Sequence, residues 1–282
     1  MARSKWGRLG GMAALCAGCV TASALADEEK PLWELGAGVA AMTFPAYRGS
    51  DETNNFVLPV PLFTYHGDFF KADRHGIRGS FFDTDRLDFT VSLALSPPAS
   101  SDDIKARSGM PDLEATFEIG PQMDITFWRS ENRARFLKLL LPMRAAFTLE
   151  GPPKDIGWVL HPKLNLDITD LPGLQGWNLG LLAGPLFGDQ RQHQYFYGVA
   201  PRYATAARPA YEADGGYAGM QYLAAVTKRF PKFWVGAFIR YDNLAGAVFD
   251  DSPLVRQKDY FAAGLALSWV FAESSTRVMV DD

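Results

Sequence analysis

Residues 260–271 read YFAAGLALSWVF, and this stretch decides the fold. Phe261, Leu265, Leu267, Trp269 and Phe271 fall on one face of an extended chain, with Ala263 among them. The residues between them are mostly small or polar. Side chains along a strand alternate between two faces, so the stretch predicts a strand with one apolar face and one small face.

The same two-residue rhythm recurs along the chain. In 86–96, every odd position from Leu87 to Leu95 is apolar, and every even position is polar or small. Further predicted strands lie at 33–42, 56–65, 69–82, 113–127, 136–149, 158–168, 177–187, 218–230 and 233–242. About ten residues, rising roughly 3.3 Å each and tilted by about 40°, cross the ~25 Å apolar band of an outer membrane. The pattern predicts an all-β protein, an antiparallel transmembrane β-barrel.

The number of strands follows from a parity rule. Eleven segments are visible, whereas single-chain bacterial barrels have even strand numbers. Dividing 69–82 into two strands at His75-Gly76 gives about 12 strands. Ten is the alternative, if a segment near the N-terminus stays outside the wall. Within 113–127, Pro121 interrupts the outward row and predicts a bulge.

Connections alternate between long and short. The long ones, 97–112, 150–157, 189–217 and 243–259, are expected on the outside of the cell. The short ones, 83–86, 129–133, 169–176 and 230–233, are expected in the periplasm.

The first 26 residues are typical of a cleaved secretory signal. Three basic residues precede an apolar segment at 9–20, and Ala24-Leu25-Ala26 forms an A-x-A cleavage site. The alternative is a lipoprotein signal cut before Cys19. We therefore expect a signal peptide at 1–26, a barrel at 27–271 and a polar tail at 272–282.

Composition excludes several classes of function. The signal holds three of the 28 Lys and Arg residues, so the mature chain has 25 basic against 32 acidic residues and a net charge of −7. No basic nucleic-acid module is present, so no nucleic-acid partner is expected. Both cysteines, Cys16 and Cys19, lie in the signal, so the mature chain has no thiolate metal site.

Charged side chains on the inward faces predict a lumen charge network. Its candidate members are Glu114, Glu118, Lys138, Arg144, His161, Lys163 and Arg240. Unpaired charges are costly in a confined interior, so ion pairing across strands is favoured over acid–base catalysis. A hydrolase would need a serine near His161, and the strand of His161 carries none. His193, in the long loop 189–217, is interpreted as a surface residue. No catalytic, metal or cofactor site is predicted.

Several passages resemble the MltA-interacting protein family, also called MipA/OmpV. They are FPAYRGS at 44–50, GDFF at 67–70, DRHGIRG at 73–79, FDTDR at 82–86, ARSGMPDL at 106–113, RPAY at 208–211, GGY at 215–217, RYDNLAGAVF at 240–249 and DSPLV at 251–255. One departure is that Phe271, where the family's barrel usually ends, is followed by an eleven-residue tail.

The resemblance implies an outer-membrane protein in contact with lipid and lipopolysaccharide. In the family's namesake it implies a non-enzymatic scaffold for peptidoglycan (murein) machinery, which links a lytic transglycosylase to a penicillin-binding protein. Other members resemble adhesins or osmotic-response porins. We therefore carry forward the scaffold first. The alternatives are a small porin-like channel for polar solutes and an adhesin acting through the loop 189–217.

Overall fold

The computed structural model describes residues 28–66, 70–73, 76–79 and 86–280. The expected signal peptide, 1–26, lies outside this range, as does His75. One large antiparallel sheet dominates the described part of the chain. Its strands are β2 (Trp33–Pro45), β3 (Thr53–His66), β4 (Phe70–Asp73), β5 (Gly76–Gly79), β6 (Leu87–Ser96), β7 (Thr116–Arg129), β8 (Arg135–Thr148), β9 (Asp155–Leu160), β10 (Lys163–Ile168), β11 (Trp177–Gly188), β12 (Gly216–Arg229), β13 (Phe233–Asn243) and β14 (Asp259–Glu273).

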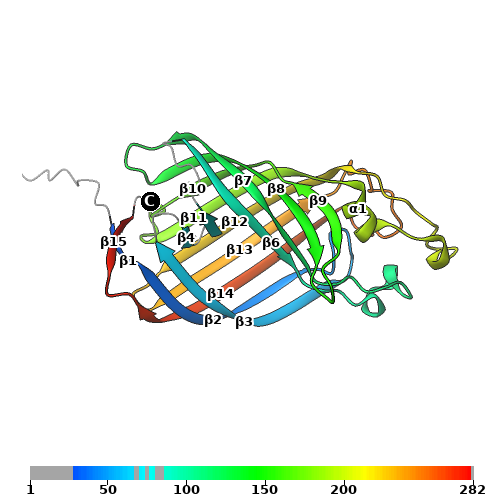
Figure 1. Cartoon of the computed structure of the whole chain (residues 1–282), viewed down its shortest axis with the longest axis horizontal. Coiled ribbons are helices and arrows are strands. Elements are labelled where there is room, and N and C mark those ends of the chain that lie inside the picture. The colour runs from blue at the N-terminus through cyan, green and yellow to red at the C-terminus, as the bar shows by residue number, and fades with distance from the viewer. Residues whose placement is uncertain (1–27, 67–69, 74–75, 80–85, 281–282) are drawn as a thin grey trace, which may run out of the picture.

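Neighbours in the sheet are almost all neighbours in the sequence. The order is β5-β4-β3-β2-β14-β13-β12-β11-β10-β8-β7-β6, and β9 pairs with β8 and β11 as β10 does. Because β9 and β10 share both neighbours, they occupy one place, and the described strands fill twelve places. β5 lies beside β6, which brings the two ends of the sheet together into a barrel (Figure 1). The expected division of 69–82 corresponds to the short strands β4 and β5.

The alternation in β14 sets which side faces outward. Phe261, Leu265 and Phe271 are each more than 60% exposed, whereas Ala262 and Ser268 on the other face are at most 2% exposed. Large apolar side chains in water would be unfavourable, so this exposed row is the lipid-facing surface of the barrel. The predicted apolar face is thus confirmed.

Three local features differ from the sequence prediction. The predicted strand 158–168 is interrupted at His161 and Pro162, because a proline has no N–H to donate to the ladder. The register is continuous across Pro121, and the bulge lies instead between Thr126 and Trp128. β7 begins at Thr116, so Leu113, predicted to face lipid, is buried in a loop core.

The two ends of the barrel are built differently (Figure 1). The long connections gather at one end, together with α1 (Gln190–Tyr197), a helix that the sequence reading had treated as loop. The short turns lie at the other end with the described ends of the chain. By the usual orientation of such barrels, we assign the long connections to the outside of the cell. No helix within the described ranges is long and apolar enough to cross a membrane.

The tail folds back on the start of the barrel. β14 continues to Glu273, two residues beyond the expected end, and the Ser274 N–H donates to the Trp33 carbonyl at 2.8 Å. β15 (Arg277–Val280) then pairs antiparallel with β1 (Glu28–Pro31) as a separate two-stranded sheet. The two described ends of the chain therefore meet at the short-turn end.

Candidate functional site

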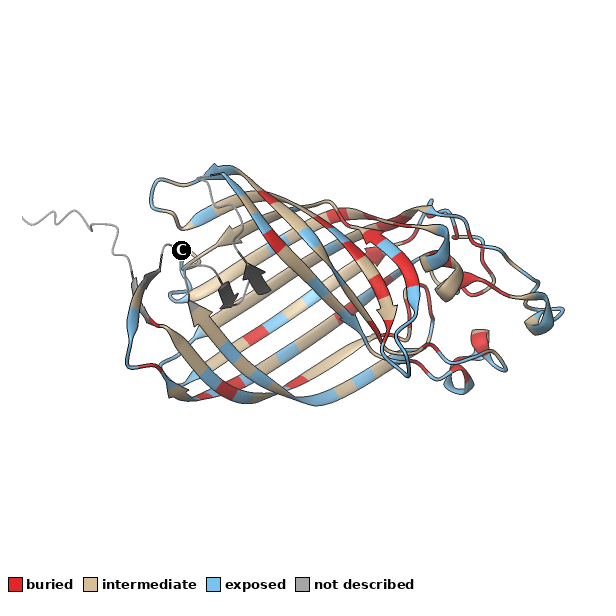
Figure 2. Cartoon of the chain, in the orientation of Figure 1, coloured by how far each residue is buried: buried red, intermediate tan, exposed pale blue. Residues whose placement is uncertain are grey.

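The long connections pack into a hydrophobic core that closes the outer end of the barrel. We call this core the cap. Its buried members are Tyr47, Ala99, Ile104, Leu113, Leu186, Tyr197, Val199, Ala213, Ala218, Leu244, Ala247, Phe249, Leu254 and Tyr260. Figure 2 shows buried residues gathered toward this end, while the wall strands alternate in exposure. Burial of apolar surface against other protein therefore concentrates in the cap.

The helix α1 brings two aromatic rings into the cap. Asp189 caps its N-terminus by accepting a hydrogen bond from the Gln192 N–H at 2.9 Å. Asp189 is also bonded to Trp158 of β9 through both its backbone and its carboxylate, which fixes where the helix starts. Tyr197, in the last turn, stacks on Phe249 with ring centroids 3.7 Å apart. The helix thus joins the loop 189–215 to the loop 244–258.

Two arginines tie the loops together through backbone carbonyls. Arg107 donates from Nη1 to the Phe196 carbonyl at 3.1 Å, and Arg208 donates from Nη1 to the Ala106 carbonyl at 3.0 Å. Arg208 also donates to the Tyr203 carbonyl at 2.8 Å. The guanidinium of arginine carries five donors, so one side chain satisfies several loop carbonyls that would otherwise be buried without partners.

The loop 244–258 is held to the other loops by hydroxyl groups. The Tyr47 hydroxyl donates to the Leu254 carbonyl at 2.6 Å, and the Ser252 hydroxyl donates to the Tyr197 carbonyl at 2.8 Å. The Asn243 side chain accepts from the Ala245 N–H at 2.9 Å and shapes the turn out of β13. Passages 44–50, 106–113, 208–211, 240–249 and 251–255, which carry the family resemblance, therefore meet in one structure.

A layer of buried ion pairs lies beneath the cap. The Asp242 carboxylate, fully buried, accepts from Arg48 Nε at 3.1 Å and from Arg240 Nε at 2.7 Å. Arg144 Nε donates to Glu118 at 2.7 Å on the facing wall. Charges are seldom buried unless they are paired, so pairing explains how these five charged side chains are held in the interior.

The structure divides the seven residues of the expected lumen charge network among several places. Glu118 and Arg144 pair with each other, while Arg240 pairs with Asp242. Glu114 lies in the loop before β7 and pairs with Lys154 at 3.2 Å.

The other three lie further along the lumen. Lys138 and Lys163 line a cavity of about 520 Å³ nearer the short-turn end. His161 is buried at the break between β9 and β10, and its Nε2 has no hydrogen-bond partner among the described residues.

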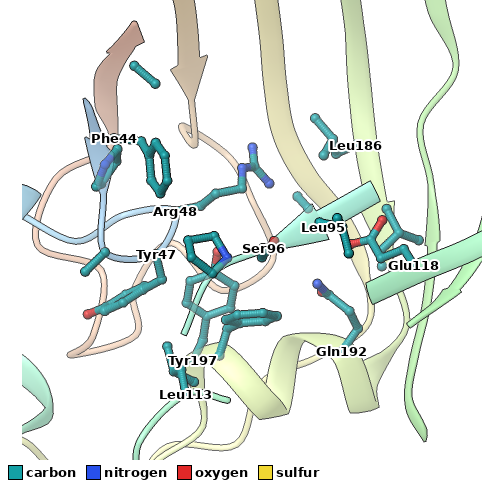
Figure 3. A pocket seen from close by; sticks show the side chains of 18 of the residues that line it. Phe44, Tyr47, Arg48, Leu95, Ser96, Leu113, Glu118, Leu186, Gln192 and Tyr197 are labelled. Carbon is teal, nitrogen blue, oxygen red and sulfur yellow. The ribbon is translucent and has the colours of Figure 1, made fainter. Parts of the chain in front are cut away.

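A second cavity, of about 320 Å³, lies directly under the cap (Figure 3). Arg48 reaches into it from the loop after β2, and Glu118 and Gln192 face it from other elements. Burial raises the pKa of Tyr197, which lines this cavity, to about 12, so its hydroxyl stays protonated. Burial also lowers the pKa of His193, which keeps that imidazole neutral near pH 7.

His193 corrects the interpretation from the sequence. Expected on the surface, it is fully buried, and its Nδ1 lies 2.6 Å from the Asp214 carbonyl. The carbonyl only accepts, so Nδ1 carries the proton and Nε2 is left as an acceptor. The sequence analysis did not predict a helix in 189–217. Asp189 could have indicated one, because aspartate is a common helix N-cap.

Arg48 and Asp242 were also missed as charged residues of the interior. Asp242 stands two positions after Arg240 on the same face of β13, so strand alternation was enough to predict that it points inward. Arg48 lies in a loop 194 residues away from Asp242 in sequence, and no periodic pattern indicates that contact. Within the described residues, no group of three metal-ligating side chains comes together.

Comparison with known proteins agrees with this architecture. The family model "MltA-interacting protein MipA" matches residues 37–271. The chain is 24% identical over 215 residues to the outer membrane protein OmpV of Vibrio cholerae serotype O1 (strain ATCC 39315 / El Tor Inaba N16961), covering 74% of this chain and 76% of that protein.

Solved outer-membrane proteins are more distant. A bacterial polysaccharide outer membrane secretin has a TM-score of 0.40 at 8% identity, over 85% of this chain and 99% of that one. The outer membrane protein OprG of Pseudomonas aeruginosa has a TM-score of 0.22 at 9% identity, over 86% and 95%. Because the MipA model covers all the strands from β3 to β13 and most of β2 and β14, the chain belongs to the MipA/OmpV family of outer-membrane β-barrel proteins.

Proposed function

We propose that this protein is a non-enzymatic scaffold in the outer membrane, which holds a lytic transglycosylase and a penicillin-binding protein at its periplasmic end. The observation that carries the proposal is membership of a family described by its interaction with MltA. Transfer of the partners from the family's namesake to this chain is the proposed step.

The cap favours a protein that binds partners at its surfaces over a channel that lets solutes pass. A porin-like channel needs a continuous aqueous path, whereas here the outer end of the lumen holds a hydrophobic core and paired charges. Of the two cavities described above, the cap lies over the one nearer the outside. The molecule is therefore better suited to act through its two ends.

The short-turn end offers the contact surface for periplasmic enzymes. Leu174 is exposed in the turn before β11, and Phe230 and Phe233 are exposed at the turn between β12 and β13. Lys228 links these two turns, since its Nζ donates to the Gln175 carbonyl at 2.7 Å and lies over the Phe230 ring. Exposed apolar side chains beside a basic group are common in protein contact sites.

Site-specific photocrosslinking in intact cells tests the proposal. A crosslinking residue at Leu174 or Lys232 is expected to capture a lytic transglycosylase or a penicillin-binding protein. The matched control is Glu212, which is exposed on the opposite, loop-bearing end. Capture of murein enzymes from neither turn position, or from Glu212 alone, would refute the scaffold.

The adhesin alternative uses the cap itself. Its motivation is the exposed outer surface of the loop 189–215, which includes Arg202 and Glu212. In the same experiment, this alternative predicts that Glu212 captures host or neighbouring-cell proteins, while the turn positions capture no murein enzyme.

A further inference from the structure

The cavity under the cap contains polar groups that lack partners. Arg48 Nη2, the Tyr260 hydroxyl and His193 Nε2 are all buried without a hydrogen-bond partner among the described residues, and all three residues line this cavity. The Tyr260 hydroxyl adjoins the Arg48 guanidinium, in a geometry short of a hydrogen bond. A buried polar group without a partner costs roughly 1–3 kcal/mol, so three at one cavity call for an explanation.

The charges around the cavity leave a positive excess. Of the charged residues that line it, Arg48, Arg144 and Arg240 are cationic, and Glu114 and Glu118 are anionic. Asp242 and Lys154 are bonded to members of this set. Three cations thus line the cavity against two carboxylates, and Asp242 and Lys154 offset each other, which leaves one positive charge for a ligand to balance.

The rest of the lining is apolar and aromatic. Rings from Phe44, Phe196, Tyr197 and Phe238 surround the space. Small-molecule sites are typically about 300–1,000 Å³, mostly apolar, with a few polar groups that fix orientation. At about 320 Å³ the cavity is at the small end of that range.

We propose that this cavity binds a small carboxylate with an aromatic or compact apolar body. Its carboxylate accepts hydrogen bonds from Arg48 Nη2 and the Tyr260 hydroxyl, and its body lies against the rings of Phe44 and Tyr197. His193 Nε2 is an acceptor, so a ligand that also carries a hydroxyl finds a partner there. The site is independent of the periplasmic contacts proposed above.

Fluorine NMR of the full-length barrel in detergent micelles tests the site with 4-fluorobenzoate. The probe is added both to the folded barrel and during refolding, so that a closed cap does not prevent entry. We expect saturable binding of 4-fluorobenzoate that unlabelled benzoate displaces. The neutral 4-fluorobenzamide is expected not to bind, and acetate, which lacks the ring, is expected not to compete at equal concentration.

Two variants separate a binding site from a structural role. Tyr260→Phe removes a hydroxyl that has no partner, so it should leave the melting temperature unchanged while weakening benzoate binding about fivefold. Arg48→Met should weaken it about tenfold or more. Asp242 keeps Arg240 and Gln221 as partners in that variant, which preserves the fold. Tyr222→Phe, on the lipid-facing wall, is the matched control and should bind like the unmodified protein.

Several results would overturn the proposal. They are the absence of saturable binding by either route of addition, equal binding of 4-fluorobenzamide, effective competition by acetate, and unchanged affinity in both Tyr260→Phe and Arg48→Met.

Discussion

At the scale of single residues, the interior of this barrel beneath the cap is organised by a few closely bonded ion pairs. Asp242 is shared by two arginines, and Arg144 spans from β8 to Glu118 of β7 and to the Ser92 hydroxyl of β6. Removing one member of a buried pair costs more than the pair contributes, because the remaining charge is left without compensation. Interior substitutions therefore test the arrangement directly.

Arg144→Met is expected to destabilise the barrel by about 3 kcal/mol, since it leaves the Glu118 carboxylate in the interior without its partner. The double variant Arg144→Met, Glu118→Gln should recover most of the loss. Urea unfolding in lipid vesicles, followed by tryptophan fluorescence, measures both. A single variant as stable as the unmodified protein would contradict this account of the pair.

His193 should make the cap sensitive to pH. Burial lowers its pKa in the folded cap below the usual value of about 6.5, so the opened cap binds a proton more readily than the closed one. The stability of the cap should be complete above about pH 6.5 and fall as the pH decreases from there through the folded pKa. Hydrogen exchange of amides in 189–215, corrected for intrinsic rates, should show protection falling over that range.

The matched variant for this pH effect is His193→Gln, which does not titrate. Its protection in 189–215 should be flat between pH 7 and pH 5, apart from any general loss of stability. A pH dependence equal to that of the unmodified protein would assign the effect to other groups.

At the scale of elements, each wall strand presents one face to lipid and one to the lumen. On β14, Leu265 is exposed on the lipid face. On β12, Thr227 lines the cavity of about 520 Å³ nearer the short-turn end. The same substitution at these two positions therefore meets different surroundings.

Leu265→Arg is expected to cost about 2–4 kcal/mol, because a charge then faces the hydrocarbon. Thr227→Arg places its side chain in the cavity of about 520 Å³, so it should lower the free energy of unfolding by less than about 1 kcal/mol. Unfolding free energies in vesicles of defined lipid give the comparison. Equal costs would show that the lipid-facing and lumen-facing sides have been assigned wrongly.

Much of the wall could be predicted from the sequence, and little of the cap could. The period of two is local, so residues such as Leu265 and Ser268 reveal their faces without knowledge of any neighbour. The cap depends on contacts such as Tyr47 with Leu254, which lie 207 residues apart. Ion pairing within the lumen was expected, but two of the partners, Lys154 for Glu114 and Arg48 for Asp242, lie in loops whose placement no periodicity encodes.

At the scale of the whole molecule, the barrel has one end filled by packed loops and one end formed by short turns (Figures 1 and 2). The core of the cap connects the loops 46–52, 97–115, 189–215 and 244–258. The ion pairs beneath it lie along the inner wall. A barrel of this design offers its two ends and its internal cavities for binding, and we predict that the packed cap blocks passage between the two sides of the membrane.

Conductance of the purified full-length barrel in a planar lipid bilayer tests this most directly. A variant with residues 190–213 replaced by a short glycine–serine turn, which removes α1 and opens the cap, controls for insertion. The account predicts that the unmodified barrel is silent and that the shortened variant conducts. Stable, stepwise conductance by the unmodified barrel would contradict it.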